Sequence, residues 1–175
     1  MENLHDLLIN RRSIRRYTDT PIDPDDVKTI LEAALMAPTS KSTRAWELTV
    51  VEDKEVLEQI SACRPMGTLP VKNCVLAVVV GVDSTKSEAW IEDASIAAVF
   101  MQLQVADLGL GSCWVQLRGR FAEDGTPSED IVRSILNIPE NASLECIVTI
   151  GYKDEVRKPM DTDKLLWERV HIGKW

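Results

Sequence analysis

Cys74-Val75-Leu76-Ala77-Val78-Val79-Val80 is the stretch that decides the fold, because every residue in it is apolar. A strand with one face in water alternates apolar and polar residues, whereas a strand covered on both faces does not. The stretch therefore predicts the central strand of a sheet, with a layer of helices on each side.

The segments around this strand carry helix and strand patterns of their own. Asp23 followed by Pro24 signals a helix start, and apolar residues at helical spacing continue the helix to Pro38. Residues 87–108 predict the longest helix, which is apolar around most of its circumference and so runs through the protein's middle or into a subunit interface. The other expected elements are helices at 3–10, after Asp53 and at 126–137, and strands at 47–52, before Leu117 and at 144–150.

Two turns have specific chemistry. Thr126-Pro127-Ser128-Glu129 predicts a capping box, in which Thr126 and Glu129 satisfy each other's backbone N–H groups. Gly109 predicts the end of the long helix, and Gly111 permits close approach of another group to the backbone. The pair does not form a dinucleotide fingerprint, because a third glycine is missing and the glycines precede a strand instead of following one.

The composition is that of an ordinary globular protein, with 175 residues, 45% of them hydrophobic and 27% charged. This length fits one domain over residues 1–175 that buries about 70% of its unfolded surface. The net charge of -8 argues against nucleic-acid binding, which needs a broad positive surface. No apolar run is long enough to span a membrane and no signal peptide is visible, so we expect a cytoplasmic protein.

The four cysteines and two histidines are too scattered to predict a metal site. Cys74 and Cys146 lie inside strand-like runs, so we expect buried thiols there and no disulfide. Cys113 is the one candidate for a thiol nucleophile or redox sensor, although no histidine lies near it in the sequence. The alternative is that Cys113 is a small buried residue.

Four arginines crowd into Arg11-Arg12-Ser13-Ile14-Arg15-Arg16 of an otherwise acidic chain. If this segment is extended, Arg11, Ser13 and Arg15 project to one side, where two guanidinium groups and a hydroxyl can bind a phosphate. The alternative is a structural cluster in which the arginines pair with the protein's own carboxylates. The pattern thus predicts either a small phosphorylated ligand or a set of internal ion pairs.

Three further segments leave alternatives open. The loop over residues 37–46 is dense in hydroxyl groups and is either a ligand loop or a solvated connection. The irregular stretch at 63–73 is a candidate mobile lid. The tail carries Leu165, Leu166, Trp167, Val170, Ile172 and Trp175, which either fold back over their own domain or, as we favour, reach across a partner subunit.

Four of these segments, in this order, resemble motifs of the FMN-dependent nitroreductase family. Arg11–Arg15 is similar to its opening R-R-S-x-R motif, and residues 37–46 are similar to its A-P-S-x-x-N-x-Q-P-W loop. Leu108–Trp114 resembles the L-G-L-G-x-x-W segment, and Gly151-Tyr152 with Arg157-Lys158 resembles the G-Y-P and basic ending. The resemblance covers the whole chain.

The resemblance implies an α+β, nitroreductase-like fold with a central mixed, mainly antiparallel sheet packed between helices, in an intertwined homodimer. It implies two FMN molecules at the subunit interface, with NADH or NADPH as electron donor. Arg15 would also stabilise the negative charge of the reduced flavin. The residues that the resemblance assigns to the cofactor are Arg11, Arg12, Ser13, Arg15, Trp114, Gln116, Leu117, Arg157 and Lys158 in one subunit, and Thr39, Ser40 and Ser42 in the other.

The loop departs from the family pattern at three positions: Ser42 replaces asparagine, Arg44 replaces glutamine and Ala45 replaces proline. These changes bear on the range of acceptors more than on the cofactor. The expected activity is hydride transfer from NAD(P)H through FMN to a small electrophilic acceptor, such as a nitroaromatic or a quinone, in ping-pong order. The alternative is a flavin-binding protein for sensing or storage, without turnover driven by a nicotinamide.

Overall fold

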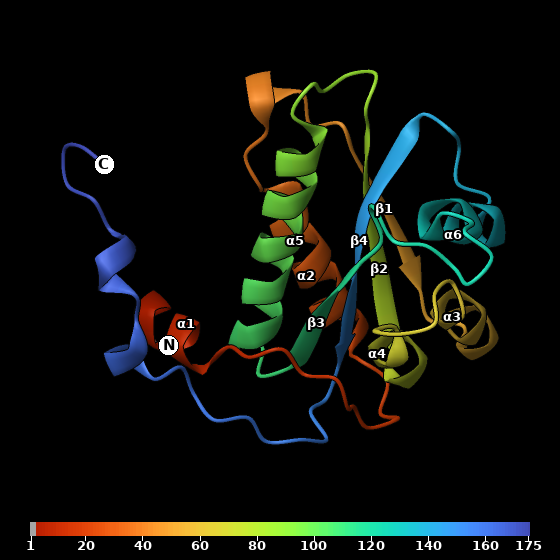
Figure 1. Ribbon diagram of the computed structural model, residues 1–175. Coiled ribbons are helices and arrows are strands. Elements are labelled where there is room, and N and C mark those ends of the chain that lie inside the picture. Colours follow the sequence, from red (N-terminus) through yellow and green to blue (C-terminus); the bar gives the residue numbers. More distant parts are fainter. Residues whose placement is uncertain (1–2) are drawn as a thin grey trace.

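The protein is an α+β structure built on one four-stranded sheet (Figure 1), here seen in a computed structural model that describes residues 3–175. The helices are α1 Leu4–Asn10, α2 Pro24–Leu35, α3 Lys54–Ser61, α4 Leu69–Asn73, α5 Trp90–Asp107 and α6 Ser128–Leu136, with short 3₁₀ turns η1 Ser40–Ser42, η2 Thr162–Lys164 and η3 Trp167–Arg169. The strands are β1 Trp46–Val51, β2 Leu76–Asp83, β3 Gly111–Gln116 and β4 Ala142–Gly151.

The apolar stretch forms β2, one of the two inner strands. The sheet has the order β1-β2-β4-β3, and each neighbouring pair is antiparallel. Every residue of β2 is buried, which confirms the predicted central strand covered on both faces. A register shift between Val80 and Gly81 marks a bulge where β2 pairs with β4.

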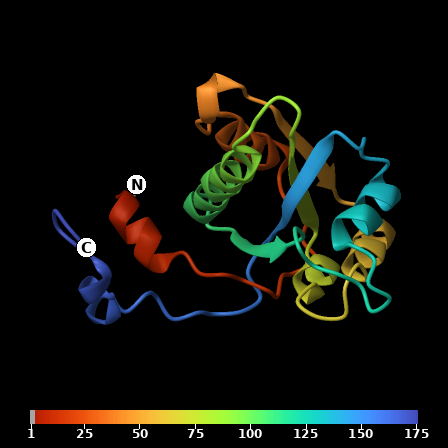
Figure 2. The ribbon, with the colours of Figure 1, turned by 45° about the horizontal axis from the view of Figure 1, so that its top comes forward.

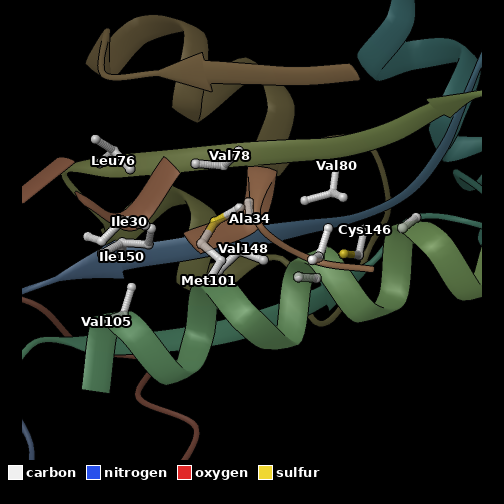
Figure 3. Close-up of a cluster of buried hydrophobic side chains, with 14 of the residues drawn as sticks. Ile30, Ala34, Leu76, Val78, Val80, Met101, Val105, Cys146, Val148 and Ile150 are labelled. Atoms are coloured by element: carbon white, nitrogen blue, oxygen red, sulfur yellow. The ribbon is translucent and has the colours of Figure 1, made fainter. Parts of the chain in front are cut away.

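Two helical layers enclose the sheet (Figure 2). Helices α2 and α5 cover one face, and α3, α4 and α6 cover the other. On the first face, side chains from α2 and α5 interdigitate with those of β2 and β4 (Figure 3). Met101 and Val105 of α5, both fully buried, point into this core. The long helix therefore runs along the sheet, as its apolar circumference predicted.

The helix starts follow the sequence in most places. The Asp23 side chain accepts from the backbone N–H of Asp25 at 2.9 Å, and Asp53 caps α3 in the same way. The capping box at α6 was a wrong prediction, because the helix begins at Ser128 with no side-chain cap. The backbone N–H of Thr126 instead donates to Asp124, and the Ser128 hydroxyl donates to the carbonyl of Cys63. Helix α4 was not predicted, and α5 begins at Trp90, three residues later than expected.

The arginine-rich segment runs extended along the outer edge of the sheet. Ser13 forms an isolated parallel bridge with Ser112 of β3, the one parallel pairing in the described residues, beside a sheet whose four strands are all antiparallel. The backbone N–H of Ile14 donates to the carbonyl of Ser112 at 2.9 Å. Ile14 and Tyr17 are buried, which fixes the segment and leaves its arginine side chains free of the core.

Two glycines create the seat for this segment. Gly111 and Gly151 are cross-strand partners at the ends of β3 and β4. A Cβ atom on Gly111 would lie 2.9 Å from Ile14, and one on Gly151 would lie 2.9 Å from Tyr17. The close approach predicted at Gly111 is therefore made by the arginine-rich segment itself.

The tail leaves the sheet and passes beside α1 (Figure 1). The N–H of Met160 donates to the carbonyl of Ile9 at 2.8 Å, but the large apolar side chains beyond it are exposed. Trp167 is 70% exposed and Trp175 is fully exposed, so the tail does not cover its own domain. No helix in residues 3–175 has the length and apolarity to span a membrane.

Candidate functional site

A cavity of about 470 Å³ lies where α1, the C-terminal end of α5 and the segment after β4 meet. Arg11 and Arg12 enter it from one side, and Arg157 enters from the other. Lys153 also lines the cavity, together with the carboxylates of Asp107 and Glu155. Four cations against two carboxylates leave a surplus of two positive charges, which matches the charge of a phosphate dianion.

The arginines are not neutralised by the protein. Among residues 3–175, no aspartate or glutamate forms an ion pair with Arg11, Arg12, Arg15 or Arg16. The guanidinium of Arg12 donates to the backbone carbonyl of Lys158 at 2.8 Å, which ties the two chain segments together without cancelling charge. The alternative of an internal ion-pair cluster is therefore wrong for this stretch.

Glu155 holds the backbone of the arginine-rich segment in place. One of its carboxylate oxygens accepts from the backbone N–H of Arg15 at 2.5 Å and from that of Arg16 at 3.2 Å, and the other pairs with Arg157 at 2.7 Å. Burial opposes ionisation of Glu155, but these donors outweigh it and lower the pKa of the carboxyl. The carboxylate thus anchors the segment and spares the side chains of Arg11 and Arg12.

The other predicted residues of this segment lie near the cavity but do not line it. Ser13 is half-buried at its bridge to Ser112, and the side chain of Arg15 is exposed. Lys158 is also exposed, and its backbone carbonyl, not its ammonium group, makes the contact with Arg12. The cavity therefore brings together Arg11, Arg12 and Arg157, and places Ser13 and Arg15 further along the same strand-like segment.

Cys113 does not have the environment of a nucleophile. It is 4% exposed, and burial raises the pKa of its thiol, although the nearby Arg15 and Arg11 oppose that rise. The reading of Cys113 as a small buried residue is confirmed. Cys63, Cys74 and Cys146 are also free and buried, and burial raises the pKa of Cys74 to about 12.

The end of β3 carries a hydrogen-bonded network. The indole of half-buried Trp114 donates to the amide oxygen of Gln116 at 2.8 Å, and the Gln116 amide donates to Glu145 at 3.0 Å. Arg118 donates to the other oxygen of Glu145 at 2.6 Å. Because Glu145 is an acceptor only, it fixes the orientation of the Gln116 amide. The side chain of Leu117 is fully buried and its N–H donates to the backbone carbonyl of Glu145 at 3.1 Å, so neither group is free for a ligand.

The hydroxyl-rich loop, residues 39–44, adopts a strained backbone. Lys41, Ser42 and Arg44 have φ of 52°, 55° and 49°, in the left-handed region that non-glycine residues seldom enter. The hydroxyl of Thr39 accepts from the backbone N–H of Arg44 at 3.1 Å and closes the loop on itself. Such strain collects at ligand sites, which favours a ligand loop over a plain solvated connection.

Asp93 and Glu145 belong to the site region but were missed by sequence reasoning. Asp93, in the first turn of α5, accepts from the backbone N–H of Ser40 at 2.8 Å. One feature of the sequence could have identified both residues, because each is a carboxylate inside an apolar pattern. Asp93 precedes the alanine-rich face of α5, and Glu145 interrupts the apolar strand β4.

The two candidate halves lie at opposite ends of α5 (Figures 1 and 2). The hydroxyl-rich loop contacts Asp93 at the start of this helix, whereas the arginine cavity contacts Asp107 at its end. At 1.5 Å per residue these positions are about 20 Å apart. The two halves therefore lie well apart within one protomer. Residues 3–175 contain no cluster of three or more His, Cys, Asp or Glu side chains placed to hold a metal ion.

Comparison with known sequences places this arrangement in a family. The family model described as Nitroreductase family matches residues 8–63 and 74–152. The chain belongs to the Nitroreductase family. A relative from Archaeoglobus fulgidus, provisionally named NADH dehydrogenase/NAD(P)H nitroreductase, is 33% identical over 180 residues, with 100% of each chain covered.

Solved structures of the nitroreductase family share the fold. An FMN-dependent nitroreductase from Clostridium difficile R20291 is 45% identical, with a TM-score of 0.94 over 97% of this chain and 98% of that one. An NADH dehydrogenase/NAD(P)H nitroreductase, provisionally so named, from Parabacteroides distasonis is 26% identical, with a TM-score of 0.90 and 100% of each chain covered. The predicted nitroreductase-like fold is confirmed.

Proposed function

We propose that this nitroreductase-family protein is an FMN-dependent oxidoreductase that uses NADH or NADPH to reduce a small electrophilic acceptor, such as a nitroaromatic or a quinone. When bound, FMN would supply the hydride chemistry, at its N5 atom. In the ping-pong order that we propose, the oxidised nicotinamide leaves before the acceptor enters. The general class rests on family membership and on the FMN-dependent relative from Clostridium difficile.

The single observation that carries the cofactor assignment is the unpaired arginine pair in the cavity. Arg11 and Arg12 lack carboxylate partners among residues 3–175, and the cavity has a surplus of two positive charges. These donors suit the phosphate of FMN, which is a dianion and accepts several charge-assisted hydrogen bonds. We assign Arg11, Arg12 and Arg157 to the phosphate, with Lys158 at its rim.

The remaining residues of the same protomer would bind the flavin ring. Ser13 and Arg15 follow along the sheet edge and would hold the pyrimidine side of the ring, where the positive charge of Arg15 would stabilise developing negative charge. Trp114 and Gln116 would bound the ring at the end of β3, with the Gln116 amide fixed by Glu145.

The site would be completed by a second copy of the chain. Thr39, Ser40 and Ser42 lie at the start of α5 and the arginine cavity lies at its end, so we assign these hydroxyl groups to the flavin of a partner. Exposed apolar side chains supply a surface for that partner. On α5 they are Val99 and Phe100, and in the tail they include Trp167 and Trp175. We therefore propose a homodimer in which each site takes its arginines from one protomer and its hydroxyl groups from the other.

The test is the spectrum and FMN affinity of the purified protein and of two matched variants. We expect a yellow protein that NADH or NADPH bleaches, with parallel lines in double-reciprocal plots against a quinone. Arg11→Ala should weaken FMN binding roughly 10–100-fold, because it removes a charge-assisted hydrogen bond. Lys28→Ala removes an equal charge from exposed α2 and should leave the affinity unchanged.

Each outcome has a distinct meaning. A protein that takes up no FMN would overturn the proposal. A yellow protein that neither nicotinamide reduces would instead support the alternative of a flavin-binding protein without turnover. Equal losses of affinity in Arg11→Ala and Lys28→Ala would show that net charge matters and that the cavity does not.

A further inference from the structure

Asp93 is a buried carboxylate that contacts the hydroxyl-rich loop from the first turn of α5. It is 2% exposed, and lysine and arginine are absent from its hydrogen-bond partners in the described part of the chain. One carboxylate oxygen accepts from the backbone N–H of Ser40 at 2.8 Å, and the other accepts from the hydroxyl of Ser87 at 2.6 Å. Burial of a carboxylate costs desolvation free energy, so a buried carboxylate is expected where its hydrogen bonds have a structural or functional role.

The bond to Ser40 acts on a loop that would otherwise relax. Lys41, Ser42 and Arg44 all occupy the left-handed region of backbone space, at a cost of about 1–3 kcal/mol each when the residue is not glycine. No residue at positions 39–44 is buried as a whole, although the Thr43 hydroxyl is, so packing does little to hold the loop. Internal bonds, including that from the Arg44 N–H to the Thr39 hydroxyl, close the loop, and an ion pair of 2.7 Å joins Lys41 to Glu88. Among the described residues, the bond to Asp93 is the one that joins the Ser40 N–H to α5.

We propose that Asp93 is a positioning residue that holds the hydroxyl-rich loop in the conformation that binds the flavin of the partner subunit. The assignment of a ligand to this loop rests on the proposed function, whereas the anchoring of the loop does not. Asp93 does not contact the reacting atoms. It acts through Ser40, whose backbone it fixes at the start of η1.

The anchoring is tested on the protein without cofactor by hydrogen–deuterium exchange of the peptide that covers residues 39–45. Asp93→Ala should speed exchange there roughly 10-fold or more, because the strained loop loses its link to α5. Asp93→Asn should stay near the wild-type rate, since its amide oxygen can accept from Ser40 and its amino group can donate to Ser87. Ser87→Ala leaves the bond to Ser40 intact and is the matched control.

Ser40→Pro provides a second route to the same result if Asp93→Ala fails to fold. It deletes the donated N–H without touching Asp93, and proline suits the first position of a helical turn preceded by the extended Thr39, whose φ is -131°. Loop exchange as slow in folded Asp93→Ala or Ser40→Pro as in wild type would overturn the proposal.

The link to the flavin is tested by mixing chains. Asp93→Ala and Arg11→Ala homodimers should each bind FMN roughly 10–100-fold more weakly than wild type. A heterodimer of the two, purified with two tags, should regain one tight site, formed by the arginines of the Asp93→Ala chain and the loop of the Arg11→Ala chain. No recovery would mean that Asp93 does not act across the interface. If wild type itself binds no FMN, the proposed function fails while the exchange experiment still decides the anchoring.

Discussion

The arginine-rich segment and the hydroxyl-rich loop are held in opposite ways. The segment is fixed by packing, because buried Ile14 and Tyr17 sit on Gly111 and Gly151 at the end of the sheet. The loop has no such packing and is held in a strained backbone by hydrogen bonds, chiefly the bond from Ser40 to Asp93. The arginine-rich segment is therefore held by the same packing that stabilises the fold, whereas the conformation of the hydroxyl-rich loop depends on a few hydrogen bonds.

The difference also separates the two forms of recognition that the site offers. Burial of Ile14 and Tyr17 leaves the arginine side chains free to bind an anion through charge. In the loop, strain presents short hydroxyl side chains and backbone N–H groups, which bind by directed hydrogen bonds. Substitutions should therefore affect fold stability strongly in the segment and weakly in the loop.

The largest expected effect on stability is at Gly111, against which the arginine-rich segment packs. Gly111→Val would place a Cβ atom 2.9 Å from Ile14 and should lower the free energy of unfolding by about 3 kcal/mol. Because valine is favoured in strands, a loss of stability in this variant would come from the steric clash and not from a poor strand propensity. Chemical denaturation measures the loss. Thr49→Val, which puts valine on β1, is the control and should change stability by less than about 0.5 kcal/mol. An unchanged midpoint for Gly111→Val would mean that the segment does not depend on this seat.

An intermediate effect is expected where Glu155 anchors the same segment. Glu155→Gln should cost about 1–2 kcal/mol at pH 7, because it weakens bonds to the backbone N–H groups of Arg15 and Arg16 and the pairing with Arg157. The pKa of Glu155 is lower in the folded state than in the unfolded state. Its contribution is thus complete above the unfolded pKa of about 4.3, and it is lost as the pH falls through the folded pKa.

The measurement is the stability of wild type and Glu155→Gln across the acid range. The gap between the two proteins should be widest near neutral pH, should narrow as the pH falls below the unfolded pKa of about 4.3, and should close below the folded pKa. Glu140→Gln, at an exposed glutamate without a hydrogen-bond partner among the described side chains, should track wild type throughout. A gap that stays constant down to pH 3 would show that packing, and not ionisation, accounts for the role of Glu155.

The same contrast explains how far the sequence could predict this molecule. Continuous apolar sequence located β2 and α5, and charge density located the arginines, because both signals lie in neighbouring residues. The roles of Asp93 and Glu145 depend on partners 53 and 29 positions away, Ser40 and Gln116, so no local pattern identifies them. The capping box failed for a local reason, because the backbone N–H of Thr126, which Glu129 would have satisfied, donates to Asp124 in the preceding turn.

The smallest expected effect is in the loop, and its sign is opposite to that at Gly111. Ser42 has a φ of 55°, so Ser42→Gly removes backbone strain while it makes the unfolded chain more flexible. These terms nearly cancel, and we expect the free energy of unfolding to rise by about 0.5 kcal/mol. FMN affinity should nevertheless fall, because the hydroxyl and the fixed loop geometry are both lost. Chemical denaturation checks the expected rise in stability, and FMN titration checks the expected fall in affinity. A fall in stability of more than about 1 kcal/mol would contradict the strain argument, since only lost native contacts could produce it.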